Sequence, residues 1–190
     1  MSQADRARWE RAHAERHDDE ARPPASFLVE NAPLLKPGLT LDLAAGSGRN
    51  ARFLASLGHR VLAIDVARAA LESIRRRNSA VDLAQMDLDS PGFRRRSIDN
   101  LVMVDFLDRR LFTPIREWLR PGGVIVVDTF LIDQREIGHP RNPAFLLEHG
   151  ELRDLLQGEQ ILRYREGRVT EATGTSFRAG IVARCRPREN

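Results

Sequence analysis

Short apolar segments alternate with amphipathic stretches between residues 39 and 130, and this alternation limits the possible folds more than any other feature. The apolar segments begin at residues 39, 60, 81, 99 and 124 and read "LTLDLA", "RVLAID", "VDLAQMD", "DNLVMVDF" and "VIVVDTF". Such runs are typical of buried β-strands, and the last is apolar enough for a central parallel strand covered on both faces. Strands that alternate with helices predict an α/β fold with a parallel sheet.

Two helices are indicated by apolar spacing in the first connections. The first covers residues 51–57 and should end at Gly58. The second has the i, i+3, i+4, i+7 pattern over residues 67–74, and the arginines of residues 75–77 follow it. Cations favour the carboxyl end of a helix, so we read this triplet as a helix terminus and not as a nucleic-acid patch.

A third helix is predicted to begin at Thr113, an N-cap residue, with Pro114 in its first turn. Its buried face would be formed by Ile115, Trp118 and Leu119, and the "PGG" of residues 121–123 would end it. A further short helix is indicated over residues 152–156 by its leucines.

The end of the chain changes character. "EQILRYREG" and "SFRAGIVARC", at residues 159–167 and 176–185, are strand-like and have no helix between them. They should pair antiparallel at one edge of the sheet. We therefore predict a single-domain, Rossmann-like, seven-stranded and mostly parallel sheet with helices on both faces. An N-terminal helical lid would occupy residues 1–38 and the main domain residues 39–190.

Composition narrows the class of protein. The chain has 190 residues and a net charge of +3, and its calculated pI of 9.9 reflects arginines more than excess charge. It has one cysteine, no apolar run of membrane-spanning length and no signal-peptide pattern. We expect a cytoplasmic protein, monomeric or weakly dimeric, that binds neither membranes nor nucleic acid. No cluster of His and Cys has metal-ligand spacing, so no metal is expected.

A glycine turn follows the first strand. In "LDLAAGSGRN", residues 41–50, Gly46, Gly48 and Ala51 stand in G-x-G-x-x-A order, which suits NAD as well as other nucleotides. Acidic residues lie within or at the end of four strands, at Asp42, Asp65, Asp87 and Asp105. Carboxylates accept hydrogen bonds from ribose hydroxyls, an adenine amine and an ammonium group, but they suit a pyrophosphate poorly. The series favours a cationic adenosine ligand over a dinucleotide.

On these residues the chain resembles the class I S-adenosylmethionine-dependent methyltransferases. The resemblance implies that Asp65 holds the ribose hydroxyls with Val66 against the adenine, that Asp87 and Leu88 contact the adenine, and that Asp105 and Phe106 lie by the methionine part. The first motif covers residues 42–48, with Asp42, Gly46 and Gly48 in it. Ala44 replaces a glycine that is common in the family, and alanine fits there if its backbone torsions are ordinary. The predicted cofactor-binding set also includes Asn50.

More narrowly, residues 46–67, 106–123 and 142–156 look like the tellurite-resistance-type methyltransferases. That resemblance implies that an N-terminal segment with Trp9, Pro24 and Phe27 folds over the cofactor. It does not fix the methyl acceptor.

The loop after the fifth strand, residues 128–147, has neither helical nor alternating periodicity and contains two prolines. We expect it at the carboxyl edge, anchored by its "AFLL" end, with His139, Arg141 and Asn142 facing the acceptor. Arg110, or its neighbour Arg109, would complete a clamp for an anionic or oxyanionic small molecule. We therefore assign His139, Arg141 and Arg110 to catalysis. If these residues are not used, the acceptor would lie under the N-terminal helix, by His13 and His17.

Three other functions are compatible with parts of the pattern. An NAD-dependent oxidoreductase would explain the glycines and Asp65, but not Asp42 or Asp87. A non-enzymatic S-adenosylmethionine-binding module would keep the acids yet hold no acceptor. An RNA methyltransferase would need a basic stripe and a base-holding site, and the fourth strand ends in "VDFLDRR" without an Asn-Pro signature.

Overall fold

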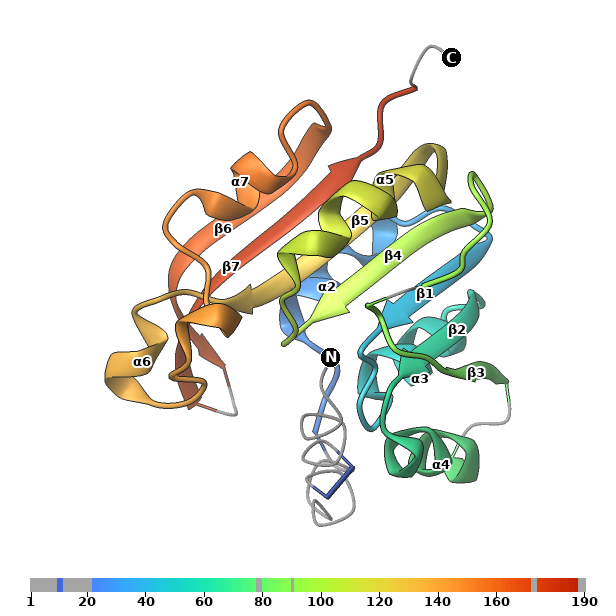
Figure 1. Ribbon diagram of the computed structural model, residues 1–190, viewed down its shortest axis with the longest axis horizontal. Helices are drawn as coiled ribbons and strands as arrows, with labels where there is room; N and C mark the ends of the chain where they lie inside the picture. Colours follow the sequence, from blue (N-terminus) through green and yellow to red (C-terminus); the bar gives the residue numbers. More distant parts are fainter. Residues whose placement is uncertain (1–9, 12–21, 78–79, 90, 172–173, 188–190) are drawn as a thin grey trace.

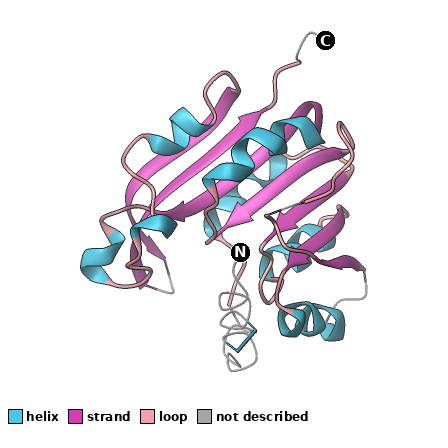
Figure 2. Cartoon of the chain, viewed as in Figure 1, coloured by secondary structure: helices cyan, strands magenta, loops and turns pink. Residues whose placement is uncertain are grey.

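The computed structural model describes residues 10–11, 22–77, 80–89, 91–171 and 174–187. One twisted sheet runs through the molecule, with helices on both of its faces (Figures 1 and 2). The strands lie in the order β3-β2-β1-β4-β5-β7-β6. Their bounds are β1 Leu39–Leu43, β2 Arg60–Asp65, β3 Val81–Gln85, β4 Ile98–Val104, β5 Leu119–Phe130, β6 Gln160–Glu171 and β7 Gly174–Arg184.

The pairing confirms the predicted fold class. Strands β1 to β5 run parallel to one another, whereas β7 is antiparallel to both β5 and β6. The last strand of the chain therefore lies inside the sheet, and β6 forms the edge. This insertion brings β7 directly against β5, with Phe130 opposite Arg178.

The α-helices in the described part of the chain are short. They are α2 Ser26–Asn31, α3 Arg49–Ser56, α4 Arg68–Arg77, α5 Phe112–Trp118, α6 Gln134–Ile137 and α7 Glu151–Leu155. The predicted helices at residues 51–57, 67–74 and 152–156 are confirmed as α3, α4 and α7. Residues 75–77 do close α4.

Two predictions for the third helix were wrong. Thr113 does not cap the helix, which begins at Phe112 and has no side-chain cap. The capped element is the preceding 3-10 turn, where the Asp108 side chain accepts a hydrogen bond from the Arg110 amide. The helix also ends before the "PGG" of residues 121–123. Leu119 is already extended and pairs with Ile98 of β4.

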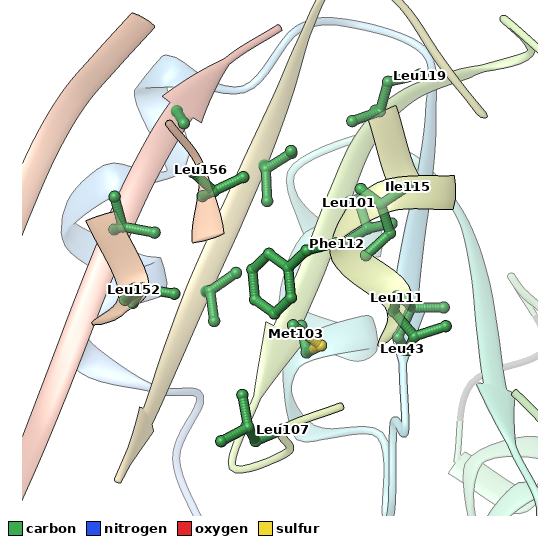
Figure 3. Packing of buried hydrophobic residues seen from close by; sticks show 14 of the residues in the cluster. Leu43, Leu101, Met103, Leu107, Leu111, Phe112, Ile115, Leu119, Leu152 and Leu156 are labelled. Carbon is green, nitrogen blue, oxygen red and sulfur yellow. The ribbon is translucent and has the colours of Figure 1, made fainter. Parts of the chain in front are cut away.

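Apolar side chains fill both faces of the sheet. On one face, α5 and α7 pack over the central strands, and Phe112, Ile115 and Leu152 lie among Met103 and Leu101 (Figure 3). On the other face, α2, α3 and α4 cover the sheet in a second cluster. Part of the segment before β1 thus belongs to the core of the domain, since Phe27 and Leu28 are buried in that second cluster.

Candidate active site

The carboxyl ends of the parallel strands bring the predicted acids to one edge of the sheet. Asp65 is the last residue of β2, Asp105 follows β4 directly, and Asp87 lies two residues beyond β3. In open α/β sheets, ligands bind at this edge, near the point where the strand order reverses. Here the order reverses between β1 and β4, which are neighbours.

The turn between β1 and α3 has an unusual backbone. Gly46 and Gly48 have φ values of 55° and 75°, and Ala44 has a φ of 54°. The prediction that alanine fits here required ordinary backbone torsions, and Ala44 does not have them. A left-handed alanine costs about 1–2 kcal/mol. At Gly48 an added Cβ would lie 2.5 Å from Ile74 Cγ1 of α4, so this position requires glycine for space as well as for φ.

Asp65 holds this turn in place. Its Oδ2 accepts a hydrogen bond from the Gly46 amide and its Oδ1 accepts one from the Ala67 amide, both at 2.9 Å. A carboxylate oxygen can accept more than one hydrogen bond, so these contacts leave capacity for further donors. Val66, the next residue, is half-buried, and its carbonyl accepts from Gln85 Nε2 at 2.9 Å.

Asp42 lies inside β1, beneath the turn, with only 1% of its surface exposed. Burial raises its pKa to about 7, against the opposing effect of a hydrogen bond with the Ala51 backbone. Its Oδ2 has no hydrogen-bond partner among the described residues. An unpaired buried carboxylate oxygen is costly, so the position of Asp42 is not explained by packing alone.

The remaining predicted cofactor residues are spread around the same edge. Asp87 accepts a hydrogen bond from the Asp89 amide, and both Leu88 and Phe106 pack against the apolar core while remaining partly exposed. Asn50 is buried, and its Oδ1 accepts from the Ala25 amide at 3.0 Å. Asn50 therefore ties the segment before β1 to the glycine turn.

Asp105 belongs to an ion network that the sequence analysis missed. Its carboxylate accepts from Arg49 Nη2 at 2.7 Å and from Arg178 Nη2 at 2.6 Å. Arg178 also donates from Nε to Asp128, at 2.9 Å, and Arg165 reaches Asp128 at 3.2 Å. The network therefore runs from α3 through β4 and β5 to the C-terminal hairpin.

The pKa values in this network follow from burial and opposite charge. Burial alone would raise the pKa of Asp105, but Arg178 and Arg49 outweigh it and the pKa is lowered. Burial would lower the pKa of Arg178, but Asp128 and Asp105 outweigh it and the pKa is raised. Both groups are therefore held in their charged forms.

A cavity of about 190 Å³ opens beside the network. Its charged lining residues are Arg22, Arg49, Asp105, Asp128, Glu171 and Arg178. Its other lining residues are Ala25, Phe130, Gln134, Gly174, Thr175 and Ser176. The cavity thus lies between the glycine-turn helix, the end of β5, the β6–β7 hairpin and the segment before α2.

The predicted acceptor residues do not line this cavity. His139 and Arg141 are exposed on the loop after α6, and Arg110 pairs with Asp108 and Asp89. The loop nevertheless starts close to the cavity, because Gln134 of the lining donates to the His139 carbonyl at 3.1 Å. The structure therefore does not bring the three predicted catalytic residues together.

Other residues of the predicted loop have structural contacts. Arg109 holds the loop through the carbonyls of Ala144 and Leu146 and through Glu151 of α7. Asn142 accepts from the Ala144 amide. The predicted apolar anchor is confirmed for residues 146–147, which are buried, but not for Phe145, which is 37% exposed.

The N-terminal segment is partly described. Phe27 is buried, and the Arg165 guanidinium lies 4.6 Å from the centroid of its ring. Pro24 is half-buried. Trp9, His13 and His17, which the sequence analysis linked to a lid, lie outside the described residues.

Part of the chain matches a known domain family. The methyltransferase domain family matches residues 40–123, from β1 into β5. Trans-aconitate 2-methyltransferase of Paracidovorax citrulli (strain AAC00-1) is 28% identical over 169 residues, which cover 83% of this chain and 63% of the relative. The chain therefore spans less than two thirds of the length of this relative.

Solved structures show the same fold. TehB from Haemophilus influenzae superposes with a TM-score of 0.73 at 20% identity, over 93% of this chain and 66% of TehB. A second structure is the 1,6-didemethyltoxoflavin-N1-methyltransferase of Burkholderia thailandensis, solved with bound 1,6-didemethyltoxoflavin and S-adenosylhomocysteine. It superposes with a TM-score of 0.70 at 20% identity, over 97% of this chain and 87% of that enzyme.

Residues 40–123 thus match a methyltransferase domain, and the chain shares its fold with solved S-adenosylmethionine-dependent methyltransferases. These similarities agree with the class and the cofactor predicted from the sequence. The similarity to TehB is a similarity of fold. The residues present also fit the cofactor, because the carboxylates of Asp65 and Asp87, at or just beyond the ends of two strands, offer acceptors to a ligand rich in donors.

No helix in the described ranges is long and apolar enough to span a membrane.

Proposed function

We propose that the protein transfers a methyl group from S-adenosylmethionine to a small anionic acceptor. The observation that carries this proposal is the cavity at the carboxyl edge, where Arg178 is buried beside Asp105. A fixed guanidinium on the wall of a small cavity is suited to a negatively charged ligand. The name of the bacterial relative supports the same class, since trans-aconitate is a small polycarboxylate.

In this proposal the acids of the strand ends bind the cofactor. Asp65 accepts hydrogen bonds from the ribose hydroxyls, Asp87 accepts from the adenine, and Val66 and Leu88 cover the adenine faces. Asp105 and Phe106 lie by the methionine part. When bound, the cofactor supplies a methyl group that its sulfonium has already activated.

The glycine turn would approach the cofactor closely with its backbone. Gly46 and Ala44 would lie against it, Gly48 and Asn50 would fix the start of α3, and Asp42 would hold the turn from below. The contacts of Asp65 with the Gly46 amide and of Asn50 with the Ala25 amide support these roles.

The chain's part in methyl transfer is alignment and the exclusion of water, since an anionic acceptor needs no base to become a nucleophile. We propose that His139 and Arg141 attract the acceptor from the exposed loop and that Arg110 extends the same positive surface. A cytoplasmic location and a monomeric or weakly dimeric state stay predictions.

A panel assay of S-adenosylhomocysteine release tests this function. Trans-aconitate, other carboxylates, inorganic oxyanions, thiols, phenols, amines and RNA would each be added with S-adenosylmethionine. We expect release above the acceptor-free rate with one or more small anions. Release with RNA alone would instead make the protein an RNA methyltransferase. Cofactor binding without release from any acceptor would favour a non-enzymatic binding module.

A further inference from the structure

Arg178 is a buried arginine with one nitrogen left unused. Only 7% of its surface is exposed, while Nε donates to Asp128 and Nη2 to Asp105. Nη1 has no hydrogen-bond partner within the described ranges, and this nitrogen is not fully enclosed by protein. Because Arg178 lines the cavity, both N–H groups of Nη1 are available there.

The surroundings of Arg178 fix the plane of this guanidinium. Its Cζ lies 4.4 Å from the centroid of the Phe130 ring, and the two aspartates hold its opposite edge. The β6 residue opposite Arg178 is Gly167, which has no side chain to cover it. The group is therefore set in place before any ligand binds, which reduces the entropy lost on binding.

A second donor lies on the same face of β7. Ser176 stands two residues before Arg178, so the two side chains point to the same side of the strand. Ser176 also lines the cavity. Two donors on one wall match the two oxygens of a carboxylate.

The charged groups around the cavity form one network. Among the described residues, Asp105 is shared by Arg49 and Arg178, and Asp128 is shared by Arg165 and Arg178. Each of these two acids therefore already faces two arginines.

We propose that Arg178 Nη1 and Ser176 Oγ bind a carboxylate of the methyl acceptor, so that Arg178 selects carboxylic acids over neutral acceptors. This assignment rests on the proposed methyl transfer to a small anion and names its chemical class and its anchor. Arg178 would act as a specificity residue at the acceptor end of the site.

The test is calorimetry of small acids on the protein saturated with S-adenosylhomocysteine. The probes are succinate, tricarballylate and benzoate, each compared with its neutral amide. We expect at least one acid to bind about tenfold or more tightly than its amide, which is the lower range for hydrogen bonds to charged groups.

Two variants locate the effect. Arg178→Lys removes the planar guanidinium with its paired N–H donors. Ser176→Asp places a carboxylate in front of Nη1. Each variant should reduce the affinity for the acid by about tenfold or more. Arg168→Lys, an exposed arginine on β6, is the matched control and should change nothing. If Arg178→Lys fails to fold by circular dichroism, Ser176→Asp still gives the answer.

Three results separate the possibilities. Loss of acid preference in both variants supports the assignment. No preference for any acid in the wild type, or a preference that survives in Ser176→Asp, overturns it while leaving methyl transfer intact. Failure of the wild type to bind S-adenosylhomocysteine at all would instead contradict the proposed function.

Discussion

Arg178 of β7 donates a hydrogen bond to Asp105 at the end of β4, at 2.6 Å, although β5 lies between the two strands. The contact is possible because Asp105 turns back over β5, where its amide donates to the Asp128 carbonyl at 3.0 Å. The C-terminal hairpin is thereby fixed to the loop that is proposed to hold the methionine part of the cofactor. Stability and binding should both depend on this network.

Replacing Asp128 by Asn should destabilise the fold. The substitution keeps the shape but removes one of the two charges that balance buried Arg178. We expect a loss of about 1.5–3 kcal/mol in the free energy of unfolding, the range for hydrogen bonds to charged groups. Urea denaturation measures it. Asp82→Asn, which breaks the exposed pair with Arg60, is the control and should cost about 0–1 kcal/mol. Equal losses in the two variants would contradict a structural role for the network.

The buried Asp42 should make stability depend on pH. Its pKa is about 7 in the folded protein against 3.8 ordinarily, so the folded state binds an additional proton between these values. Stability should therefore fall as the pH rises from 3.8 to about 7 and should lose nothing more from this group above that range. Asp42→Asn should remove this decline and be more stable than wild type at pH 8, by on the order of 2 kcal/mol. Urea denaturation at pH 5 and pH 8 would detect it, and an identical pH dependence in the variant would refute the assignment.

Asp65→Ala should weaken cofactor binding. A carboxylate that holds both ribose hydroxyls contributes about 1.5–3 kcal/mol, so the affinity for S-adenosylhomocysteine should fall at least about tenfold. The variant also loses the hydrogen bonds to the Gly46 and Ala67 amides, so Asp65→Asn serves as the isosteric control. Calorimetry on folded protein gives both affinities. An unchanged affinity in Asp65→Ala would show that the ribose lies elsewhere.

The double variant His139→Ala and Arg141→Ala should separate acceptor capture from cofactor binding. Because both side chains are exposed and contact no predicted cofactor residue in the described structure, cofactor affinity should stay the same while acceptor turnover falls. The S-adenosylhomocysteine release assay measures turnover. Unchanged turnover would assign capture to the cavity residues alone or to the N-terminal residues around His13 and His17.

The sheet and its active edge could be predicted because the signals are local. Apolar runs defined β2 to within a residue, and helical spacing found α3 and α4. The start of α5 was missed because Thr113 and Pro114 resemble an N-cap and a first-turn proline, whereas the helix begins at Phe112 without a side-chain cap. Nothing in the local pattern shows that a 3-10 turn capped by Asp108 precedes them.

The ion network could not be predicted, because its members come from distant parts of the chain. The network forms only after β7 inserts between β5 and β6, which brings Arg178 to Asp128 and to the Asp105 that Arg49 also contacts. The order of strands in a sheet cannot be predicted from local sequence patterns. One signal was available. The charged Arg178 interrupts the apolar alternation of "SFRAGIVARC", and a charge inside a buried strand needs a partner.

The central claim is that the glycine turn and the strand-end acids bind an S-adenosyl ligand. Calorimetric titration of the full chain with S-adenosylhomocysteine, and separately with NAD, tests it most directly. The account predicts saturable binding of S-adenosylhomocysteine and no measurable binding of NAD. Tighter binding of NAD than of S-adenosylhomocysteine would contradict it.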